Sequence, residues 1–317
     1  MQKVLVTSRS FGKTTDRPFQ ILQEAGLEYT LMGSDFSQEA FARAVPDYDA
    51  LIIGAHPFDT ADMERCGKLK IICKHGAGLD NIDLEKAREM GITITNVPAM
   101  NANAVADLAF AHILNLCRGV SLTNAWVHQG QWKTFIGRDV YQKTLGLVGF
   151  GAIAKNVALR ARGFSMKVLA YDPYVKELPG EFSDYVTLCD FETAVTQSDI
   201  VSIHVPLTEE TRNLFDKQTL MKMRKDAYLV NTGRGGIINE ADLYTCMKEG
   251  WLTGAALDVT ETEPIQAGNP LLTLENVVVT PHIGMYSREA LGAVSVICAE
   301  NAVKKLSGVP PRFMVVE

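Results

Sequence analysis

Residues 144–172 read TLGLVGFGAIAKNVALRARGFSMKVLAYD and contain the pattern that decides the fold. The apolar run from Leu145 to Val148 predicts a buried strand, and the stretch from Ala152 to Arg162 has the pattern of a helix. A second strand, from Lys167 to Tyr171, ends at Asp172. Two strands joined by a helix in this way predict neighbouring strands of a parallel sheet.

The turn between the first strand and the helix has the pattern G-x-G-x-x-A, at Gly149, Gly151 and Ala154. Gly149 permits the tight turn, Gly151 lets the backbone approach a pyrophosphate at the helix N-terminus, and Ala154 is small enough for the helix to pack on the strand. Asp172 lies 23 residues after Gly149, where a carboxylate would accept hydrogen bonds from an adenosine ribose and repel a 2′-phosphate. The stretch therefore predicts a site for NAD rather than NADP. The alternative is a glycine-rich turn of another α/β protein.

Composition excludes several classes of protein. A chain of 317 residues with a net charge of −6 has room for two domains and no excess of basic residues for a nucleic acid. The longest apolar helix pattern, Ala104 to Cys117, is interrupted by Asp107, His112 and Asn115, so no membrane span is expected. The start, MQKVLVTSRS, reads as a strand without a signal peptide. Six scattered cysteines without a C-x-x-C predict reduced thiols, a cytoplasmic protein and no metal site.

The order of the patterns predicts an α/β protein of two domains with parallel sheets. Residues 1–98 alternate short apolar runs with helical patterns, as in a parallel sheet covered on both faces. A boundary is expected at Pro98, and the final helix, Ser287 to Leu306, would return to the first domain. We therefore expect residues 1–98 and 286–317 to form a flavodoxin-like substrate domain. Residues 99–285 would form an inserted Rossmann domain for the dinucleotide.

Residues 121–143 fit neither type of domain pattern, because the stretch is irregular and rich in aromatic side chains. An excursion of this length is unusual inside a compact domain. It would either wrap around a partner subunit or pack as a surface loop on its own chain.

Three groups that could carry chemistry, Arg234, Glu263 and His282, follow predicted strands of the second domain. Ligands of open α/β sheets bind at the carboxyl ends of the strands. An imidazole can act as a base near neutral pH, a guanidinium can hold a carboxylate, and a carboxylate can orient the imidazole. Taken singly, each has a plain alternative: a solvated turn arginine, an exposed loop acid and a buried core histidine.

The first domain has its own glycine-rich turn, His75-Gly76-Ala77-Gly78, directly after a predicted strand. It would either present backbone N–H groups to an anion or be an ordinary turn. His56, Lys74 and His75 would either supply cations for a second anionic group of a substrate or be surface residues.

Seven stretches in a fixed order resemble the D-isomer-specific 2-hydroxyacid dehydrogenases, close to the D-3-phosphoglycerate dehydrogenase branch. They are HGAGLDNID (75–83), NANAVADLAF (101–110), TLGLVGFGAIA (144–154), HVPLTEETRNL (204–214), NTGRGGIINEADL (231–243), ALDVTETEP (256–264) and TPHIG (280–284). The resemblance implies a two-domain fold with a closing cleft and a homodimer whose arm includes residues 121–143. It also implies that Arg234 binds the substrate, that His282 is the general acid/base and that Glu263 is the partner of His282.

The resemblance and the patterns together give the expected binding residues. Those for NAD are Gly149, Gly151, Ala152, Ile153, Asp172, His204, Pro206, Thr232, Asp258 and Gly284. Those for the substrate are Gly76, Ala77, Gly78, Asn101 and Arg234.

The expected reaction is hydride transfer between nicotinamide and a small anionic D-2-hydroxy acid or 2-oxo acid, with 3-phosphoglycerate or a phosphonate analogue as candidates. The loop at residues 54–57 lacks the Arg-Ser that phosphoglycerate enzymes often carry there. Two alternatives stay open: oxidation of a related anion such as phosphite or a phosphonate aldehyde, and an NAD(H)-sensing protein of the corepressor kind.

Overall fold

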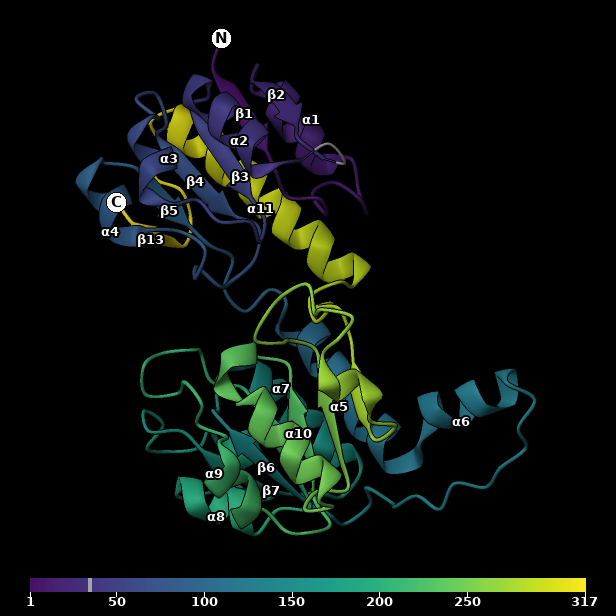
Figure 1. Cartoon of the computed structure of the whole chain (residues 1–317). Coiled ribbons are helices and arrows are strands. Elements are labelled where there is room, and N and C mark those ends of the chain that lie inside the picture. Colours follow the sequence, from purple (N-terminus) through teal and green to yellow (C-terminus); the bar gives the residue numbers. More distant parts are fainter. Residues whose placement is uncertain (34–35) are drawn as a thin grey trace. The chain divides into compact units, whose positions relative to one another are not determined.

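The computed structural model describes residues 1–33 and 36–317, and the chain divides into two compact units (Figure 1). Unit 1 comprises residues 1–101 and 285–317, and unit 2 comprises residues 102–284. Unit 2 is thus an insertion in the sequence of unit 1. The assignment of substrate binding to unit 1 and of dinucleotide binding to unit 2 stays a prediction.

Unit 1 is built on a six-stranded sheet in the order β13-β5-β4-β3-β1-β2. Its strands are β1 (Lys3–Val6), β2 (Glu28–Leu31), β3 (Ala50–Ile53), β4 (Ile71–Lys74), β5 (Thr93–Thr95) and β13 (Met314–Val316). The first five are parallel in the order 2-1-3-4-5, and β13 is antiparallel to β5. This order is that of the flavodoxin-like fold, so the predicted fold class of this unit is confirmed.

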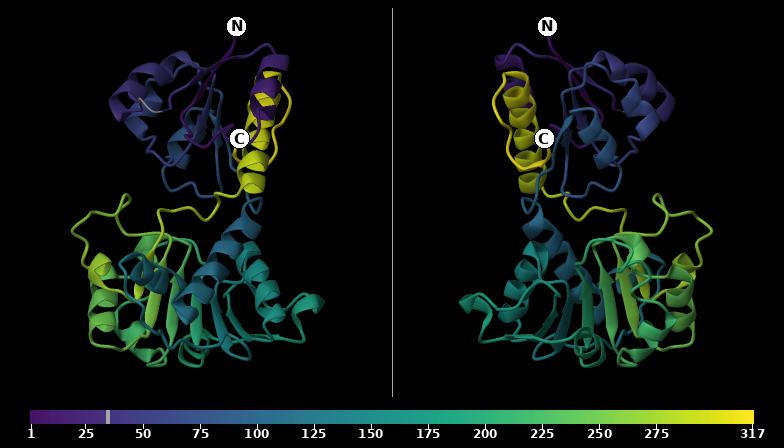
Figure 2. Two further views of the ribbon diagram at one scale, coloured as in Figure 1. Left: turned by 90° about the vertical axis from the view of Figure 1, so that its right-hand side faces the viewer. Right: turned by 90° about the vertical axis from the view of Figure 1, so that its left-hand side faces the viewer.

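Helices cover both faces of the sheet in unit 1. The helices are α1 (Arg17–Glu24), α2 (Gln38–Ala44), α3 (Thr60–Glu64), α4 (Leu84–Glu89) and α11 (Arg288–Leu306), with a 3₁₀ turn at Val45–Asp47. Figure 2 shows α1 and α11 side by side, and both pack on the core that contains Val4, Ile52 and Ile71. A second core, around Leu51 and Ile72, lies under α2, α3 and α4. Because both faces are buried, β3 and β4 read as continuous apolar runs.

Unit 2 is built on a seven-stranded parallel sheet in the order β12-β11-β10-β9-β6-β7-β8. Its strands are β6 (Thr144–Val148), β7 (Lys167–Tyr171), β8 (Val186–Leu188), β9 (Ile200–Ile203), β10 (Tyr228–Asn231), β11 (Gly254–Leu257) and β12 (Val277–Val279). In chain order within the unit this is 3-2-1-4-5-6-7, the Rossmann arrangement, so the predicted fold class is confirmed here too. The order reverses between β6 and β9, where such sheets bind ligands.

The helices of unit 2 also cover both faces of its sheet. The helices are α5 (Ala102–Arg118), α6 (Val120–His128), α7 (Ala152–Gly163), α8 (Phe191–Thr196), α9 (Lys217–Lys222) and α10 (Glu240–Lys248), with 3₁₀ turns at Gly180–Phe182, Gly235–Ile237 and Pro270–Thr273. One core lies under α5 and α7, and the other under α8, α9 and α10. Short polar side chains begin several of these helices: Asp190, Asp216 and Asn239 each accept a hydrogen bond from a backbone N–H of the first turn.

The structure corrects the prediction of an irregular stretch at residues 121–143, because α6 occupies its first part. No residue of α6 is buried, and Figure 1 shows α6 extending away from the sheet of its unit, followed by an extended segment. The sequence pattern did not predict this helix, because α6 has no stripe of apolar residues that faces a core. Five other short elements, β8, β13, α3, α8 and α9, also lacked a clear pattern.

No single helix in the described ranges is long and apolar enough to cross a membrane. Only α5 and α6 taken together would pass such a test, and they are bent by 63° relative to each other. Nine of the 17 residues of α5 are buried in the core, as in a core helix.

Candidate active site

The candidate catalytic groups of unit 2 follow three adjacent strands. Arg234 follows β10, Glu263 follows β11, and His282 follows β12. Parallel pairing of β10 with β11 and of β11 with β12 brings their carboxyl ends to one edge of the sheet. The three side chains therefore come from neighbouring loops, although 48 residues separate Arg234 from His282.

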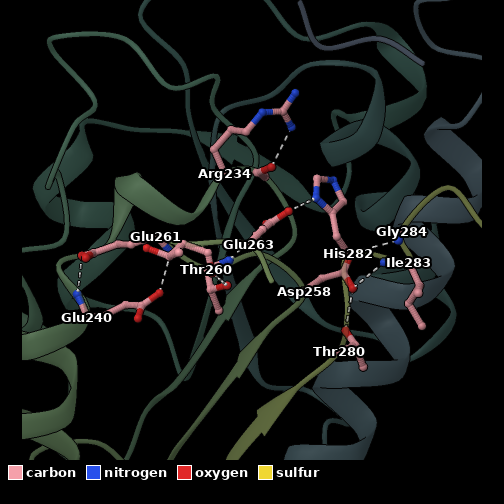
Figure 3. A network of polar contacts seen from close by, with 12 residues as sticks. Arg234, Glu240, Asp258, Thr260, Glu261, Glu263, Thr280, His282, Ile283 and Gly284 are labelled. Atoms are coloured by element: carbon pink, nitrogen blue, oxygen red, sulfur yellow. Dashed lines mark hydrogen bonds and ion pairs between the residues drawn. The ribbon is translucent and has the colours of Figure 1, made fainter. Parts of the chain in front are cut away.

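His282 and Glu263 form the central pair of the site. His282 Nδ1 lies 2.7 Å from Glu263 Oε2, and Figure 3 shows the imidazole turned towards this carboxylate. The backbone N–H of Thr260 also donates to Glu263, at 3.3 Å. The side chain of His282 is 46% exposed, which excludes the alternative of a core histidine.

The charge of Glu263 is stabilised by its neighbours. Burial opposes its ionisation, but the hydrogen bond from His282 and the positive charges of His282 and Arg234 hold the pKa of Glu263 below its ordinary value. A carboxylate at Nδ1 fixes the ring orientation and leaves Nε2 as the nitrogen that faces away from Glu263. His282 Nε2 makes no hydrogen bond with the described residues.

The turn that carries Arg234 is held by Asn231, a fully buried residue at the end of β10. Asn231 Oδ1 accepts from the N–H of Gly233 at 2.9 Å, and its Nδ2 donates to the carbonyl of Arg234 at 2.8 Å. A Cβ at Gly235 would overlap the carbonyl of Thr260, so glycine lets this turn approach the loop that carries Glu263. The guanidinium of Arg234 donates to the carbonyl of Gly233 at 2.8 Å.

Asp258 holds the loop that carries His282. Its carboxylate is buried and accepts three hydrogen bonds: from the Thr280 hydroxyl at 2.6 Å and from the N–H groups of Ile283 and Gly284 at 2.9 and 2.8 Å (Figure 3). His282 itself has a φ of 52°, in the left-handed region that non-glycine residues seldom adopt. Its N–H donates to the carbonyl of Asp258 at 2.9 Å. Asp258 and Gly284 were both expected at the cofactor. The structure shows them in contact with each other, where they shape the loop that carries His282.

The glycine-rich turn fits a dinucleotide on two observations. Gly149 has a φ of 93°, and a Cβ there would lie 2.7 Å from the carbonyl oxygen of His204, so the turn itself requires glycine. Gly151 differs, since its φ is −77° and a Cβ there would meet no atom of the protein within 4 Å. Neither its backbone nor its packing needs glycine, so the turn has open space beside Gly151.

The N-terminus of α7 also fits the pyrophosphate. Its N-cap residue, Gly151, provides no side-chain hydrogen bond, so the first N–H groups of the helix have no side-chain cap. Ala152 is exposed and Ile153 half-buried at this end of α7. Such a helix end binds anions through its N–H groups and its dipole.

The remaining residues expected at the cofactor lie at the same edge of the sheet. Asp172, after β7, accepts from the N–H of Phe150 at 2.8 Å and from that of Tyr174 at 2.9 Å, so it also holds the glycine-rich turn. His204 and Pro206 follow β9, and Thr232 follows β10. Each oxygen of Asp172 keeps a lone pair available for a ribose hydroxyl.

Unit 1 contains the turn expected to bind substrate, directly after β4. Gly76 has a φ of 144°, and its carbonyl accepts from the N–H of Val97 at 2.9 Å. The side chain of Asn96 donates to the carbonyl of Ala77 at 2.8 Å. Gly78 is half-buried, as is Asn101, the last residue of the first segment of unit 1.

The structure corrects both interpretations of His75. The side chain is 3% exposed, so it is not a surface residue, and burial lowers its pKa to about 4, so it is neutral rather than cationic near pH 7. Lys74 is buried too, and its Nζ donates to the carbonyl of Gly54 and to Asn81 Oδ1, each at 2.6 Å. Burial also lowers the pKa of His56.

Four residues that the sequence did not single out hold the loops of the candidate site: Asn231, Thr260, Thr280 and His112. Only Asn231 had a recognisable signal, since an Asn between an apolar strand and a glycine-rich turn favours such side-chain contacts. In the part of the chain that the structure describes, no cluster of His, Cys, Asp or Glu could hold a metal ion.

A Rossmann sheet with an imidazole, a carboxylate and a guanidinium at the carboxyl ends of its strands fits the class of nicotinamide-dependent dehydrogenases. The sequence model described as "D-isomer specific 2-hydroxyacid dehydrogenase, NAD binding domain" matches residues 110–284. The chain belongs to the D-isomer-specific 2-hydroxyacid dehydrogenase family. It is an NAD-dependent oxidoreductase, as its resemblance to the family predicted.

Similar proteins and a solved structure support this assignment. The chain is 40% identical over 291 residues to a glyoxylate reductase of Korarchaeum cryptofilum, with 88% of this chain and 86% of the relative covered. It is 38% identical over 304 residues to a D-3-phosphoglycerate dehydrogenase of Archaeoglobus fulgidus, covering 95% of this chain but 57% of that relative. The crystal structure of the TT0316 protein from Thermus thermophilus superposes with a TM-score of 0.91 at 36% identity, covering 99% of this chain and 100% of that one.

Proposed function

We propose that the protein interconverts a small anionic D-2-hydroxy acid and the corresponding 2-oxo acid, with His282, Glu263 and Arg234 as the catalytic groups. The observation that supports this most directly is the 2.7 Å contact between His282 Nδ1 and Glu263 Oε2, which orients the imidazole and leaves Nε2 for the substrate. NAD, when bound, supplies the acceptor or donor of the hydride.

Each group has a defined task in this proposal. His282 Nε2 takes the proton of the substrate hydroxyl during oxidation and returns it to the carbonyl oxygen during reduction. Glu263 stabilises the imidazolium that forms in the first case. Arg234 holds the substrate carboxylate through two parallel hydrogen bonds, which fixes the position of the reacting carbon.

We propose that Gly149, Gly151, Ala152, Ile153 and Asp172 bind the adenosine and pyrophosphate part of NAD. The space beside Gly151 and the uncapped start of α7 support this assignment. His204, Pro206, Thr232, Asp258 and Gly284 are proposed for the nicotinamide part. Gly76, Ala77, Gly78 and Asn101 are the proposed contribution of unit 1 to the substrate.

The substrate we favour carries one carboxylate, as glyoxylate and hydroxypyruvate do. The neutral His75 and the lowered pKa of His56 remove two of the three cations considered for a second anionic group. The third, Lys74, is engaged with Gly54 and Asn81. For 3-phosphoglycerate and phosphonate analogues we therefore expect weaker binding. The comparisons give no support to oxidation of phosphite or a phosphonate aldehyde, or to a dinucleotide sensor.

The test is steady-state turnover, followed by NADH absorbance, of a panel of 2-oxo acids: glyoxylate, hydroxypyruvate, phosphohydroxypyruvate and 2-oxo phosphonates. His282→Ala should lower kcat by about a thousandfold because the proton-transferring group is lost. Lys217→Ala, at an exposed position of α9, is the control and should keep wild-type kcat. Undiminished turnover in His282→Ala would refute the assigned role, and a preference for phosphohydroxypyruvate would refute the substrate ranking.

We also propose a cytoplasmic homodimer. All six cysteines are free, which agrees with a reducing compartment. In the segment 120–143 large apolar side chains are left exposed, among them Trp132 at 93% and Ile136 at 92%. Exposed apolar groups of this size fit a subunit contact, and Trp132→Asp with Ile136→Asp should shift the sedimenting species from dimer to monomer.

A further inference from the structure

A group of buried polar side chains in unit 1 includes His75, the residue directly before the turn Gly76–Gly78. Its members are Ser8, Ser10, His75 and Ser295, and none is more than 9% exposed. The strongest contact joins β4 to α11: His75 Nε2 lies 2.8 Å from Ser295 Oγ. An apolar side chain could fill a buried position without needing a hydrogen-bond partner, so a buried imidazole with a fixed partner indicates a role beyond packing.

The contacts of Ser295 determine which ring nitrogen of His75 carries the hydrogen. Ser295 Oγ accepts from the N–H of Gly12 at 3.3 Å, and His75 Nε2 is the only acceptor for its hydroxyl hydrogen in residues 1–33 and 36–317. Burial lowers the pKa of His75 to about 4, so the ring is neutral near pH 7. Ser295 therefore donates to Nε2, and the hydrogen of the ring lies on Nδ1, which faces Ser10 Oγ at 3.5 Å. These contacts hold the imidazole in one orientation.

The helix α11 is a firm support for this bond, because it packs on β3 and β4. Ser295 and Cys298 lie three residues apart on its buried face. Cys298 Sγ donates to the carbonyl of Lys74 at 3.4 Å. Contacts from α11 thus hold two successive residues, Lys74 and His75, immediately before the turn.

The other side of the turn is held by the two residues that follow β5. The carbonyl of Gly76 accepts from the N–H of Val97 at 2.9 Å, and the carbonyl of Ala77 accepts from Asn96 Nδ2 at 2.8 Å. In a trans peptide the N–H points opposite to the C=O, so the N–H groups of Ala77 and Gly78 point away from these two residues. Neither N–H makes a hydrogen bond within the described ranges. The turn therefore presents two neighbouring donors, whose direction depends on how the chain is held before and after them.

We propose that His75 and Ser295 are positioning residues for the substrate: their hydrogen bond fixes the direction of the N–H groups of the turn and thereby sets the affinity for the 2-oxo acid. This inference rests on the proposed function, in which the turn binds the substrate. Both side chains are buried, so they act through the backbone of the turn rather than by contact with the substrate. The effect should appear in KM rather than in kcat, because the groups that transfer the proton and the hydride are unchanged.

Steady-state kinetics with glyoxylate and hydroxypyruvate at saturating NADH test the proposal. Ser295→Ala removes the donor and should raise KM for both acids about tenfold, with kcat within about twofold of the wild-type value. His75→Leu removes the acceptor and should raise KM by a similar factor. The double variant should be no worse than either single variant, because all three lose the same bond. His75→Gln can place its amide oxygen near the position of Nε2 and should recover most of the loss.

Asn301→Ala is the matched control, because Asn301 is another fully buried polar residue of α11. Its side chain accepts from the N–H of Arg312 at 2.8 Å and donates to the carbonyl of Arg312 at 2.9 Å. Loss of both bonds should lower the unfolding temperature at least as much as Ser295→Ala does. KM for both acids should not change in Asn301→Ala, which separates a change in the turn from a general loss of stability.

The variants together decide the outcome. A rise of KM in Ser295→Ala and His75→Leu that His75→Gln reverses supports the proposal. Wild-type KM in both variants, a loss confined to kcat, or an equal rise of KM in Asn301→Ala overturns it. Absence of turnover by the wild-type protein with every 2-oxo acid would refute the proposed function itself, a failure that is detected without any variant.

Discussion

Replacement of Gly151 by alanine should separate cofactor binding from folding. Its φ of −77° is accessible to alanine, and the added methyl group would meet no protein atom within 4 Å. Two small effects on stability act in opposite directions. Alanine reduces the freedom of the unfolded chain, which stabilises the protein by about 0.4–1 kcal/mol. Alanine is also a poorer N-cap residue than glycine, which costs roughly as much at the start of α7.

The effect on NADH should be much larger. If the pyrophosphate lies against Gly151, the methyl group occupies space that the ligand needs, and overpacking of this kind costs about 1–3 kcal/mol. The dissociation constant for NADH should then rise by about 5- to 150-fold. The free energy of unfolding without ligand should stay within about 1 kcal/mol of the wild-type value.

The assays are urea denaturation followed by circular dichroism, and titration of NADH by calorimetry. Gly163→Ala is the matched control, because Gly163 ends the same helix, also has open space around its Cβ position, and lies far along the chain from the turn. Gly149→Ala provides the contrast: with a φ of 93° and a clash with His204, it should lose stability even without ligand. Wild-type NADH affinity in Gly151→Ala would refute the placement of the pyrophosphate.

Three further predictions follow from individual contacts. Glu263→Gln should lower kcat about a hundredfold with little change in KM, because the imidazolium of His282 loses its counter-charge. A loss of kcat that is matched by a similar loss in the free energy of unfolding would contradict this. Asp172→Ala should raise the ratio of kcat/KM for NADPH to kcat/KM for NADH at least about tenfold. The lost contact to Phe150 should affect both cofactors equally, so it cancels in this ratio. An unchanged ratio would count against a contact between Asp172 and the ribose. The pKa of His75 falls from 6.5 to about 4 on folding, so between these values the unfolded chain binds a proton that the folded chain excludes, and stability falls by about 3 kcal/mol as the pH drops through this window. Unfolding by urea at several pH values should show this slope, and His75→Asn should flatten it.

The fold was largely predictable because both sheets are buried on their two faces. Such strands read as continuous apolar runs, and helices between them predict parallel pairing. The resulting orders, flavodoxin-like in unit 1 and Rossmann in unit 2, agree with the prediction. The helix α6 was not predicted, because a helix with no buried residue has no periodic pattern of apolar residues.

For the candidate site, the sequence predicted which loops contribute residues but not the contacts that hold those loops. Parallel strands bring their carboxyl ends to one edge, so Arg234 and His282 could be grouped from the sequence alone. Which buried polar side chain holds which loop depends on contacts of about 3 Å that no spacing rule contains. Asp258 shows the consequence. The resemblance of the chain to the family suggests that Asp258 binds the cofactor, yet its carboxylate accepts three hydrogen bonds from residues 280–284. Because those bonds set the left-handed backbone at His282, a substitution of Asp258 should alter proton transfer as well as NADH binding, and its effects cannot be assigned to the cofactor alone.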